Sequence, residues 1–183
     1  MASPAATETF APGVVFDPDE KQLVFHYLIG KLSGNTGEAG FSYIREIDLY
    51  QHQPSQIPTL AHESGHKKWY FFSRLCKQGR NFNRQVAGGF WRKTGADSDV
   101  NNDSGTPTAK KTVLRYYMKD PITNKAVETR WLMNLYMLIE SQPPNPNNEE
   151  SDMLTPWTLC VVYRSRWAAA RSRRNGRNNA DNN

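Results

Sequence analysis

The sequence predicts an α+β domain in which a twisted antiparallel β-sheet is flanked by short helices. One helical pattern occurs, near the N-terminus, and strand-like segments fill most of the remainder of the chain. The connections between these segments are turn-like and contain no crossover helices of the kind that parallel strands need. With 183 residues, 38% of them hydrophobic, the chain can form one domain with a substantial core.

The first predicted element is an amphipathic helix. Asp17 can cap its N-terminus, and Pro18 suits the first helical position. Gly34 can end the helix in a left-handed conformation. Between these signals, apolar residues recur at steps of mostly three and four, which predicts one buried face: Leu23, Val24, Tyr27, Leu28 and Leu32.

Strands follow the helix. We expect a short strand within residues 43–50, at most one helical turn between Pro54 and Pro58, and mobile polar loops at 98–107 and 142–152. The longer strands are predicted at 68–73, 89–94, 110–117, 126–138 and 156–163. The expected core residues on them are Val113, Tyr117, Trp131, Met133 and Leu135.

Positive charge is concentrated in one segment. Between His66 and Thr94 the chain has no Asp or Glu, whereas eight cations alternate there with aromatic residues. A solvated sheet face normally carries acids as well as bases, so this segment indicates a surface for a polyanion, most simply DNA. We expect the sheet to present these cations as a stripe along the phosphates. They are Lys67, Lys68, Arg74, Lys77, Arg80, Arg84, Arg92 and Lys93.

The composition argues against secretion and membrane insertion. Cys76 and Cys160 cannot form a disulfide framework, and the first residues have neither a basic region nor an apolar one. No apolar run approaches the roughly 20 residues that span a bilayer. We therefore expect a soluble, intracellular protein with no membrane partner.

One pentapeptide, from His62 to His66, matches the H-E-x-x-H signature of zinc proteases in its letters only. That chemistry needs a helix with both histidines on one face and a third ligand. Gly65 weakens any helix, strand residues begin two positions after His66, and no third ligand follows. The sequence therefore predicts no enzyme, no metal site and no cofactor.

Five blocks of the sequence occur in the order and approximate spacing of a known family. They are Pro12-Gly13-x-x-Phe16-x-Pro18 with Leu23-Val24; Trp69-Tyr70-Phe71-Phe72-Ser73; Asn83-Arg84 with Gly89-Phe90-Trp91-Arg92-Lys93-Thr94-Gly95-Ala96-Asp97; Lys110-Lys111-Thr112 with Trp131-Leu132-Met133-Asn134-Leu135-Tyr136; and Trp157-Thr158-Leu159-Cys160. From about residue 12 to residue 164, the chain resembles the NAC domain of plant transcription factors.

The resemblance implies double-stranded DNA as a partner, with a CGT-containing core, and places the edge of strand 89–94 in the major groove. It implies phosphate contacts from Arg80, Arg84, Lys110 and Lys111, and groove positions for Trp91, Arg92, Lys93, Thr94 and Gly95. The residues alone leave Trp91 as well suited to the core as to the groove. For the two lysines, an ordinary surface position is the lesser alternative. Arg92-Lys93 stands where the family has Lys-Ala, so a cation replaces a small residue.

The resemblance also implies dimerisation, with itself or with other NAC-type proteins. The corresponding interface positions are Pro12, Gly13, Val15 and Gln22. In the family, an Arg and a Glu form an ion pair at the last two positions, and both charges are absent here. Losing both leaves apolar contacts without a charge-assisted bond, which predicts a weak dimer.

The expected organisation is a flexible N-terminus (1–11), a NAC-type DNA-binding domain (12–164) and a short, Arg-rich basic tail (165–183). The tail suits nuclear import or added phosphate contacts, or is a solvated chain end. The predicted function is a nuclear, sequence-specific DNA-binding transcription factor. The alternatives are a partner that heterodimerises with full-length family members and blocks them, and a single-stranded nucleic-acid binder.

Overall fold

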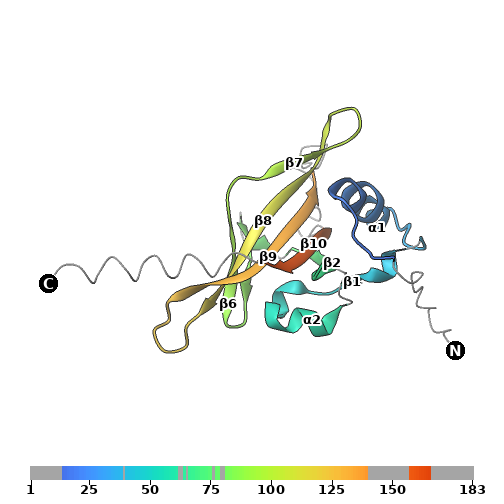
Figure 1. Cartoon of the computed structure of the whole chain (residues 1–183). Helices are drawn as coiled ribbons and strands as arrows, with labels where there is room; N and C mark the ends of the chain where they lie inside the picture. The colour runs from blue at the N-terminus through green and yellow to red at the C-terminus, as the bar shows by residue number, and fades with distance from the viewer. Residues whose placement is uncertain are drawn as a thin grey trace, which may run out of the picture.

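The computed structural model describes residues 14–38, 40–61, 64, 66–75, 77–78, 81–139 and 157–165. It is built on an eight-stranded sheet in the order β1-β2-β10-β9-β8-β6-β5, with β7 also paired to β8 (Figure 1). The strands are β1 (Ile44–Glu46), β2 (Lys68–Arg74), β5 (Gln85–Val86), β6 (Gly89–Lys93), β7 (Ser98–Asn101), β8 (Pro107–Lys119), β9 (Ala126–Leu138) and β10 (Trp157–Arg164), and a separate pair joins β3 (Lys77–Gln78) to β4 (Asn81–Phe82).

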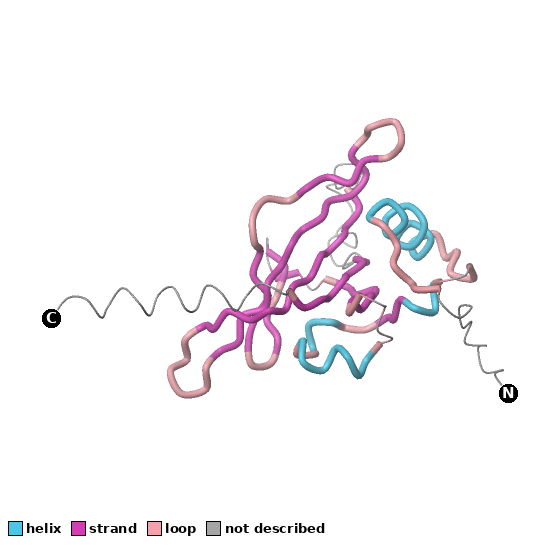
Figure 2. The backbone as a smooth tube through the Cα atoms, in the orientation of Figure 1, coloured by secondary structure: helices cyan, strands magenta, loops and turns pink. Residues whose placement is uncertain are grey.

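The helices are short and lie around this sheet (Figure 2). None in the described part of the chain is long and apolar enough to cross a membrane. They are η1 (Gln22–Leu28), which continues into α1 (Ile29–Leu32), then η2 (Phe41–Tyr43), η3 (Leu49–Gln51), η4 (Pro54–Gln56) and α2 (Ile57–Leu60). The predicted fold class, a twisted sheet flanked by short helices, is confirmed. The sheet is mixed, however, because β1 pairs with β2 in parallel.

The first helix begins later than the sequence predicted. Asp19, not Asp17, supplies the cap: its carboxylate accepts from the Gln22 N–H at 2.8 Å, and the Gln22 side chain accepts from the Asp19 N–H at 2.9 Å. This reciprocal capping box satisfies two N–H groups at the start of the helix. The predicted end is confirmed, because Gly34 has a φ of 75° and the Asn35 N–H donates to the Gly30 carbonyl at 2.9 Å.

Both faces of the sheet are covered. Tyr70 and Phe72 of β2 pack with the first helix, whereas Trp69 and Phe71 point to the other face, against Ile57 of α2. This alternation follows from the two-residue period of a strand. The helix-side cluster is Phe16, Leu23, Val24, Tyr27, Leu28, Phe41, Ile44, Tyr70, Phe72, Val100, Ala109, Tyr136, Leu159 and Val161. The α2-side cluster includes Leu49, Trp69, Phe71, Val86, Trp91, Leu114, Tyr116, Met133, Leu135, Cys160 and Val162.

Two predicted segments differ from the structure. The prediction of a mobile loop at 98–107 is wrong at its start, because residues 98–101 form β7 against β8 and Val100 is buried. The helical turn between Pro54 and Pro58 is longer than predicted, because η4 runs directly into α2 with Pro58 inside it. Within 43–50, only Ile44–Glu46 is a strand. The predicted loop at 142–152 lies outside the described residues.

The predicted core is only partly right. Met133 and Leu135 are buried, but Val113, Tyr117 and Trp131 are half-exposed. On β8, Leu114 and Tyr116 occupy the α2-side core instead, and Val113 points to the opposite face. The first helix covers only part of that opposite face, so Val113 is incompletely buried there.

Candidate nucleic-acid interface

β6 changes from a doubly paired strand into a sheet edge along its length. On one side its whole length pairs with β8, from Gly89 opposite Met118 to Lys93 opposite Leu114. On the other side β5 reaches only Gly89 and Phe90, and the Trp91 N–H donates to the Arg84 carbonyl at 2.9 Å. Among the described residues, no strand pairs with Arg92 or Lys93 on that side. The strand predicted to enter the DNA groove therefore ends in a free edge.

The chain leaves this edge through a turn that is fixed at one point. The Thr94 N–H donates to the Val113 carbonyl at 2.9 Å, and the Thr94 hydroxyl donates to the same carbonyl at 3.2 Å. Gly95 then takes a φ of +85°, which strains other residues, and no atom lies within 4 Å of where its Cβ would be. Backbone at Gly95 is therefore open to a close approach by a ligand.

The side chains of β6 divide between core and solvent. Trp91 is 3% exposed, and its ring centroid lies 5.4 Å from that of Tyr116, so its indole belongs to the core. Arg92 and Lys93 are exposed and point to opposite faces of the strand, with Arg115 opposite Arg92. The Trp91 side chain is thus not available at the edge, and the two cations provide the exposed side chains.

Lys93 is ion-paired within the protein. Its ammonium lies 2.8 Å from Asp97, and the same carboxylate accepts from the Thr112 hydroxyl at 2.7 Å. Chiefly the hydrogen bond from Lys93, and then that from Thr112, hold the pKa of Asp97 below its ordinary value. The extra cation of this motif is therefore largely neutralised in the free protein.

The two adjacent lysines of β8 have different environments. Lys110 is exposed and has no ion-pair partner among the described residues. Lys111 points to the helix side of the sheet, where its ammonium contacts the carboxylate of Glu20. Of the two predicted phosphate contacts, Lys110 is thus the one with an available charge.

Arg84 sits where β5 begins, beside the free edge of β6. Its side chain is half-buried, and its Nε is buried without a hydrogen-bond partner in the described part of the chain. An unpaired buried donor is unfavourable, but this atom is closed to solvent and therefore also to an incoming acceptor. A phosphate at this position would have to contact the accessible part of the half-buried side chain. Arg80, the other arginine predicted to contact phosphates, lies outside the described residues.

The eight cations do not form one stripe. Lys68 and Arg74 belong to β2, which is separated from β6 by β10, β9 and β8. Lys68 lies 2.7 Å from Asp17, and Arg74 stacks over the Trp157 ring at 4.3 Å. The stripe prediction is wrong for these residues, because their strand folds to the far side of the sheet.

Metal chemistry has no cluster of ligands within the described residues. His66 is exposed, and its Nε2 lies 3.4 Å from Asp17. His62 and Glu63 of the H-E-x-x-H sequence, like Cys76, lie outside the described residues.

Comparison with known proteins identifies the family. The family model described as No apical meristem (NAM) protein matches residues 11–138. NAC transcription factor 29 of Arabidopsis thaliana is 32% identical over 88% of this chain and 59% of its own length. NAC domain-containing protein 67 of Oryza sativa subsp. japonica is 34% identical, over 89% and 59% of the two chains.

The chain belongs to the NAC family. This confirms the resemblance predicted from the sequence. Members of this family are transcription factors and not enzymes, in agreement with the prediction that the chain is not an enzyme. NAC domain-containing protein 2 of Solanum lycopersicum is a further relative, 33% identical over 85% of this chain and 55% of its own. The chain spans about half the length of the curated relatives it matches.

The segment that the NAC resemblance assigns to dimerisation is partly described. Val14 and Val15 are 54% and 50% exposed, and they line an open hollow of about 510 Å³ with Gln22 and Tyr27. The side-chain amide oxygen of Gln22 accepts from the Asp19 N–H in the capping box of the first helix. Pro12 and Gly13 lie outside the described residues. Two apolar side chains thus stand exposed at the predicted interface, Val15 as one of its predicted positions and Val14 as its neighbour.

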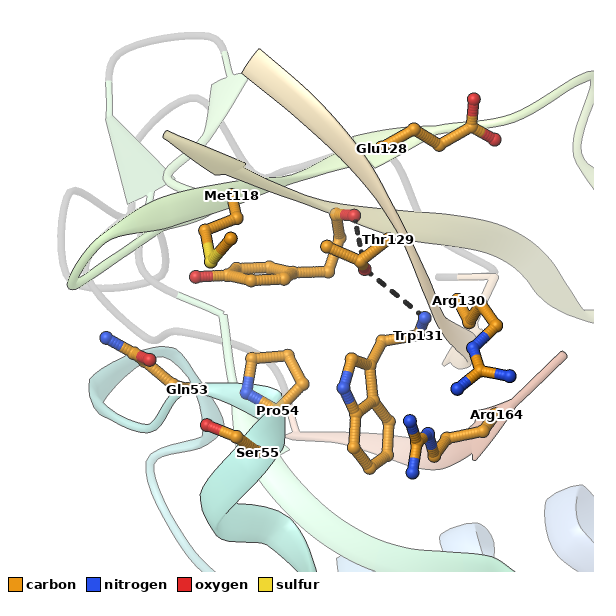
Figure 3. A pocket seen from close by; sticks show the side chains of 10 residues that line it. Gln53, Pro54, Ser55, Met118, Glu128, Thr129, Arg130, Trp131 and Arg164 are labelled. Atoms are coloured by element: carbon orange, nitrogen blue, oxygen red, sulfur yellow. Dashed lines mark hydrogen bonds between the residues drawn. The ribbon is translucent and has the colours of Figure 1, made fainter. Parts of the chain in front are cut away.

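A second hollow, of about 340 Å³, opens between η4 and the strands β8, β9 and β10 (Figure 3). Sequence reasoning did not single out Arg130, and it grouped Arg164 with the arginines of the basic C-terminal segment. The Arg164 guanidinium lies 5.2 Å over the Trp131 ring, and Arg130 lies beside it (Figure 3). Their proximity follows from the pairing of β9 with β10, which the spacing of charges along the sequence does not reveal.

Proposed function

We propose that this chain is a sequence-specific, double-stranded DNA-binding protein that regulates transcription in the nucleus. The free edge of β6 at Arg92–Lys93 is the observation that carries the proposal. A strand edge offers backbone groups and alternate side chains to the base edges of a major groove. Residues 12–164 would form the DNA-binding domain, and a CGT-containing core is its proposed target.

Phosphate contacts would flank this edge. Arg84 is a half-buried arginine beside this edge, and the accessible part of its guanidinium would pair with a phosphate oxygen. Lys110 brings an exposed ammonium on the neighbouring strand. Arg80 is proposed as a further phosphate contact by resemblance, and Thr94 and Gly95 as the backbone beside the groove. Trp91 would act through its backbone and its place in the core.

Dimerisation would bring two such edges to one site. Val14 and Val15 supply exposed apolar surface next to Gln22, and the family's charge pair is absent there. We propose a dimer, with itself or with another NAC-type chain, that is weaker than an Arg-Glu pair would allow. Sedimentation should show a monomer–dimer equilibrium in the micromolar range; a tight nanomolar dimer would refute this.

Salt titration of the full chain tests DNA reading. On a duplex with a CGT core and a scrambled duplex, five or six phosphate contacts give a slope of log affinity against log salt of about −4 to −6. We expect tighter binding to the CGT core. Arg84→Ala should weaken both duplexes alike and make the slope shallower by about 0.9. Arg92→Ala should reduce the preference for the core instead.

Arg45→Ala is the matched control, because Arg45 is an exposed arginine on β1, at the far edge of the sheet. It should leave both duplexes unaffected. A triple substitution of Arg171, Arg173 and Arg174 by Gln should keep the preference for the core. Binding that ignores sequence, or that disappears with these tail arginines, contradicts the proposal. A chain that binds no duplex but removes a longer relative from its own duplex would support the blocking alternative.

A further inference from the structure

Lys93 and Asp97 hold each other at the free end of β6, and Asp97 is itself held by the core of the sheet. One carboxylate oxygen lies 2.8 Å from the Lys93 ammonium, and the other accepts from the Thr112 hydroxyl at 2.7 Å. Thr112 is 9% exposed in the middle of β8. The side chains of Lys93 and Asp97 are 38% and 33% exposed, so the pair is partly shielded from water. The carboxylate is therefore fixed, and the ammonium is fixed to it.

This pair sets the charge that the edge presents. Arg92 has no ion-pair partner among the described residues, whereas Lys93 is neutralised. If Lys93 moved to a phosphate, the Asp97 carboxylate would keep the Thr112 hydroxyl as its hydrogen-bond partner and the more distant positive charge of Lys110. Removing one partner of a partly exposed pair is modestly unfavourable, because the remaining charge loses its nearest compensating charge. Lys93 thus has a competing partner that a surface lysine lacks.

We propose that Asp97 is a positioning residue that withholds Lys93 from the DNA phosphates. This inference rests on the proposed function of the β6 edge. A lysine that contacts phosphate adds affinity for every duplex and carries no sequence information. By holding Lys93, Asp97 lowers the sequence-independent part of the affinity and its salt dependence. The edge then presents one available cation, Arg92, instead of two.

A double-mutant cycle on the full chain tests this, with salt titrations on the CGT-core and scrambled duplexes. Asp97→Asn removes the charge but keeps an oxygen that can accept from Thr112. We expect Asp97→Asn to bind both duplexes more tightly, with a salt slope steeper by about 0.9, as one added phosphate contact requires. Its gain over the wild-type chain should therefore shrink about 3.5-fold between about 50 and 200 mM salt.

The other variants assign that gain to Lys93. Lys93→Ala alone should leave the slope unchanged, and the double variant should return to the wild-type slope. The ratio of affinities for the two duplexes should stay constant throughout, since phosphate contacts add equally to both. Asp99→Asn is the matched control: it changes the charge by the same amount on β7, where Asp99 has no ion-pair partner among the described residues. It should not steepen the slope comparably.

Four results would overturn the inference. An equal gain in Asp99→Asn would show that net charge alone acts. A shallower slope in Lys93→Ala would show that Lys93 already binds phosphate, and a lower affinity ratio in that variant would show that it reads a base. A wild-type chain that binds no duplex overturns the proposed function and this inference together. Thermal melting of each variant confirms that it is folded, since a misfolded Asp97→Asn chain would lose affinity and not gain it.

Discussion

Lys111 on β8 forms an ion pair with Glu20 at the start of the first helix, 91 residues earlier in the chain. The Tyr136 hydroxyl donates to the same carboxylate at 3.4 Å. The lysine side chain is only 20% exposed, so most of it packs between the helix and the sheet. This pair joins the first helix to the sheet. It also distinguishes Lys111 from its neighbour Lys110, which is exposed.

We therefore predict that substituting Lys111 affects stability, whereas substituting Lys110 affects DNA binding. Lys111→Gln should lower the free energy of unfolding by about 0.5–1 kcal/mol, the range for a partly exposed pair, and leave the salt dependence of DNA binding unchanged. Lys110→Gln should leave unfolding unchanged and make the salt slope shallower by about 0.9. Urea unfolding and salt titration measure the two effects. Equal changes of slope in both variants would contradict this assignment.

The burial of Trp91 leads to a second prediction. Trp91→Phe removes part of a buried ring and should lower the free energy of unfolding by about 1–2 kcal/mol. The loss is limited because the indole N–H has no partner among the described residues, so no hydrogen bond is broken. Because the indole lies in the core, the preference for the CGT core should not change while the variant remains folded. Unchanged stability together with a lost preference would show instead that the ring contacts the groove.

Much of the fold could be predicted because its signals are local. The bounds of β9 follow from the strand-like composition of residues 126–138 after the turn-like residues before them, and the end of the first helix follows from Gly34. β7 was missed because its sequence is rich in Ser, Asp and Asn, which disfavour strands, and because pairing with β8 and burial of Val100 stabilise it. The helix start was misplaced because Asp17 and Asp19 both suit a cap. The Gln three residues after Asp19 was the signal that distinguished them.

The site was less predictable, because the charge of a residue does not reveal its partner. The sequence identified Lys68, Lys93 and Lys111 as equivalent cations, but each is neutralised by an acid that the fold brings to it. Asp17 and Glu20 lie outside the acid-free segment, and only tertiary packing places them there. Likewise, the free edge of β6 depends on how far β5 extends beside it, which the motif itself does not state.

Asp17 shows how such a partner also supports the fold. Its carboxylate lies 2.7 Å from the Lys68 ammonium, accepts from the Tyr70 hydroxyl at 3.1 Å and lies 3.4 Å from His66. These contacts attach the segment before the first helix to β2. Chiefly the hydrogen bond from Lys68 holds the pKa of Asp17 below its ordinary value of 3.8, against a smaller opposing effect of burial.

The third prediction follows from the sign of that shift. A carboxyl whose pKa is lower in the folded state stabilises the fold above its unfolded pKa, and this contribution is lost as the pH falls through the folded pKa. At pH 5.5, Asp17→Asn should therefore unfold about 0.5–1 kcal/mol more easily than the wild-type chain, a figure reduced for partial exposure. The difference should shrink as the pH falls below 3.8, and it should vanish once the pH is below the folded-state pKa of Asp17. Urea unfolding across this range measures the difference. Lys68→Gln removes the main cause of the shift, so its difference in free energy of unfolding from the wild-type chain should also shrink in acid. A difference that stays constant or widens in acid would show that Asp17 acts through packing and not through its charge.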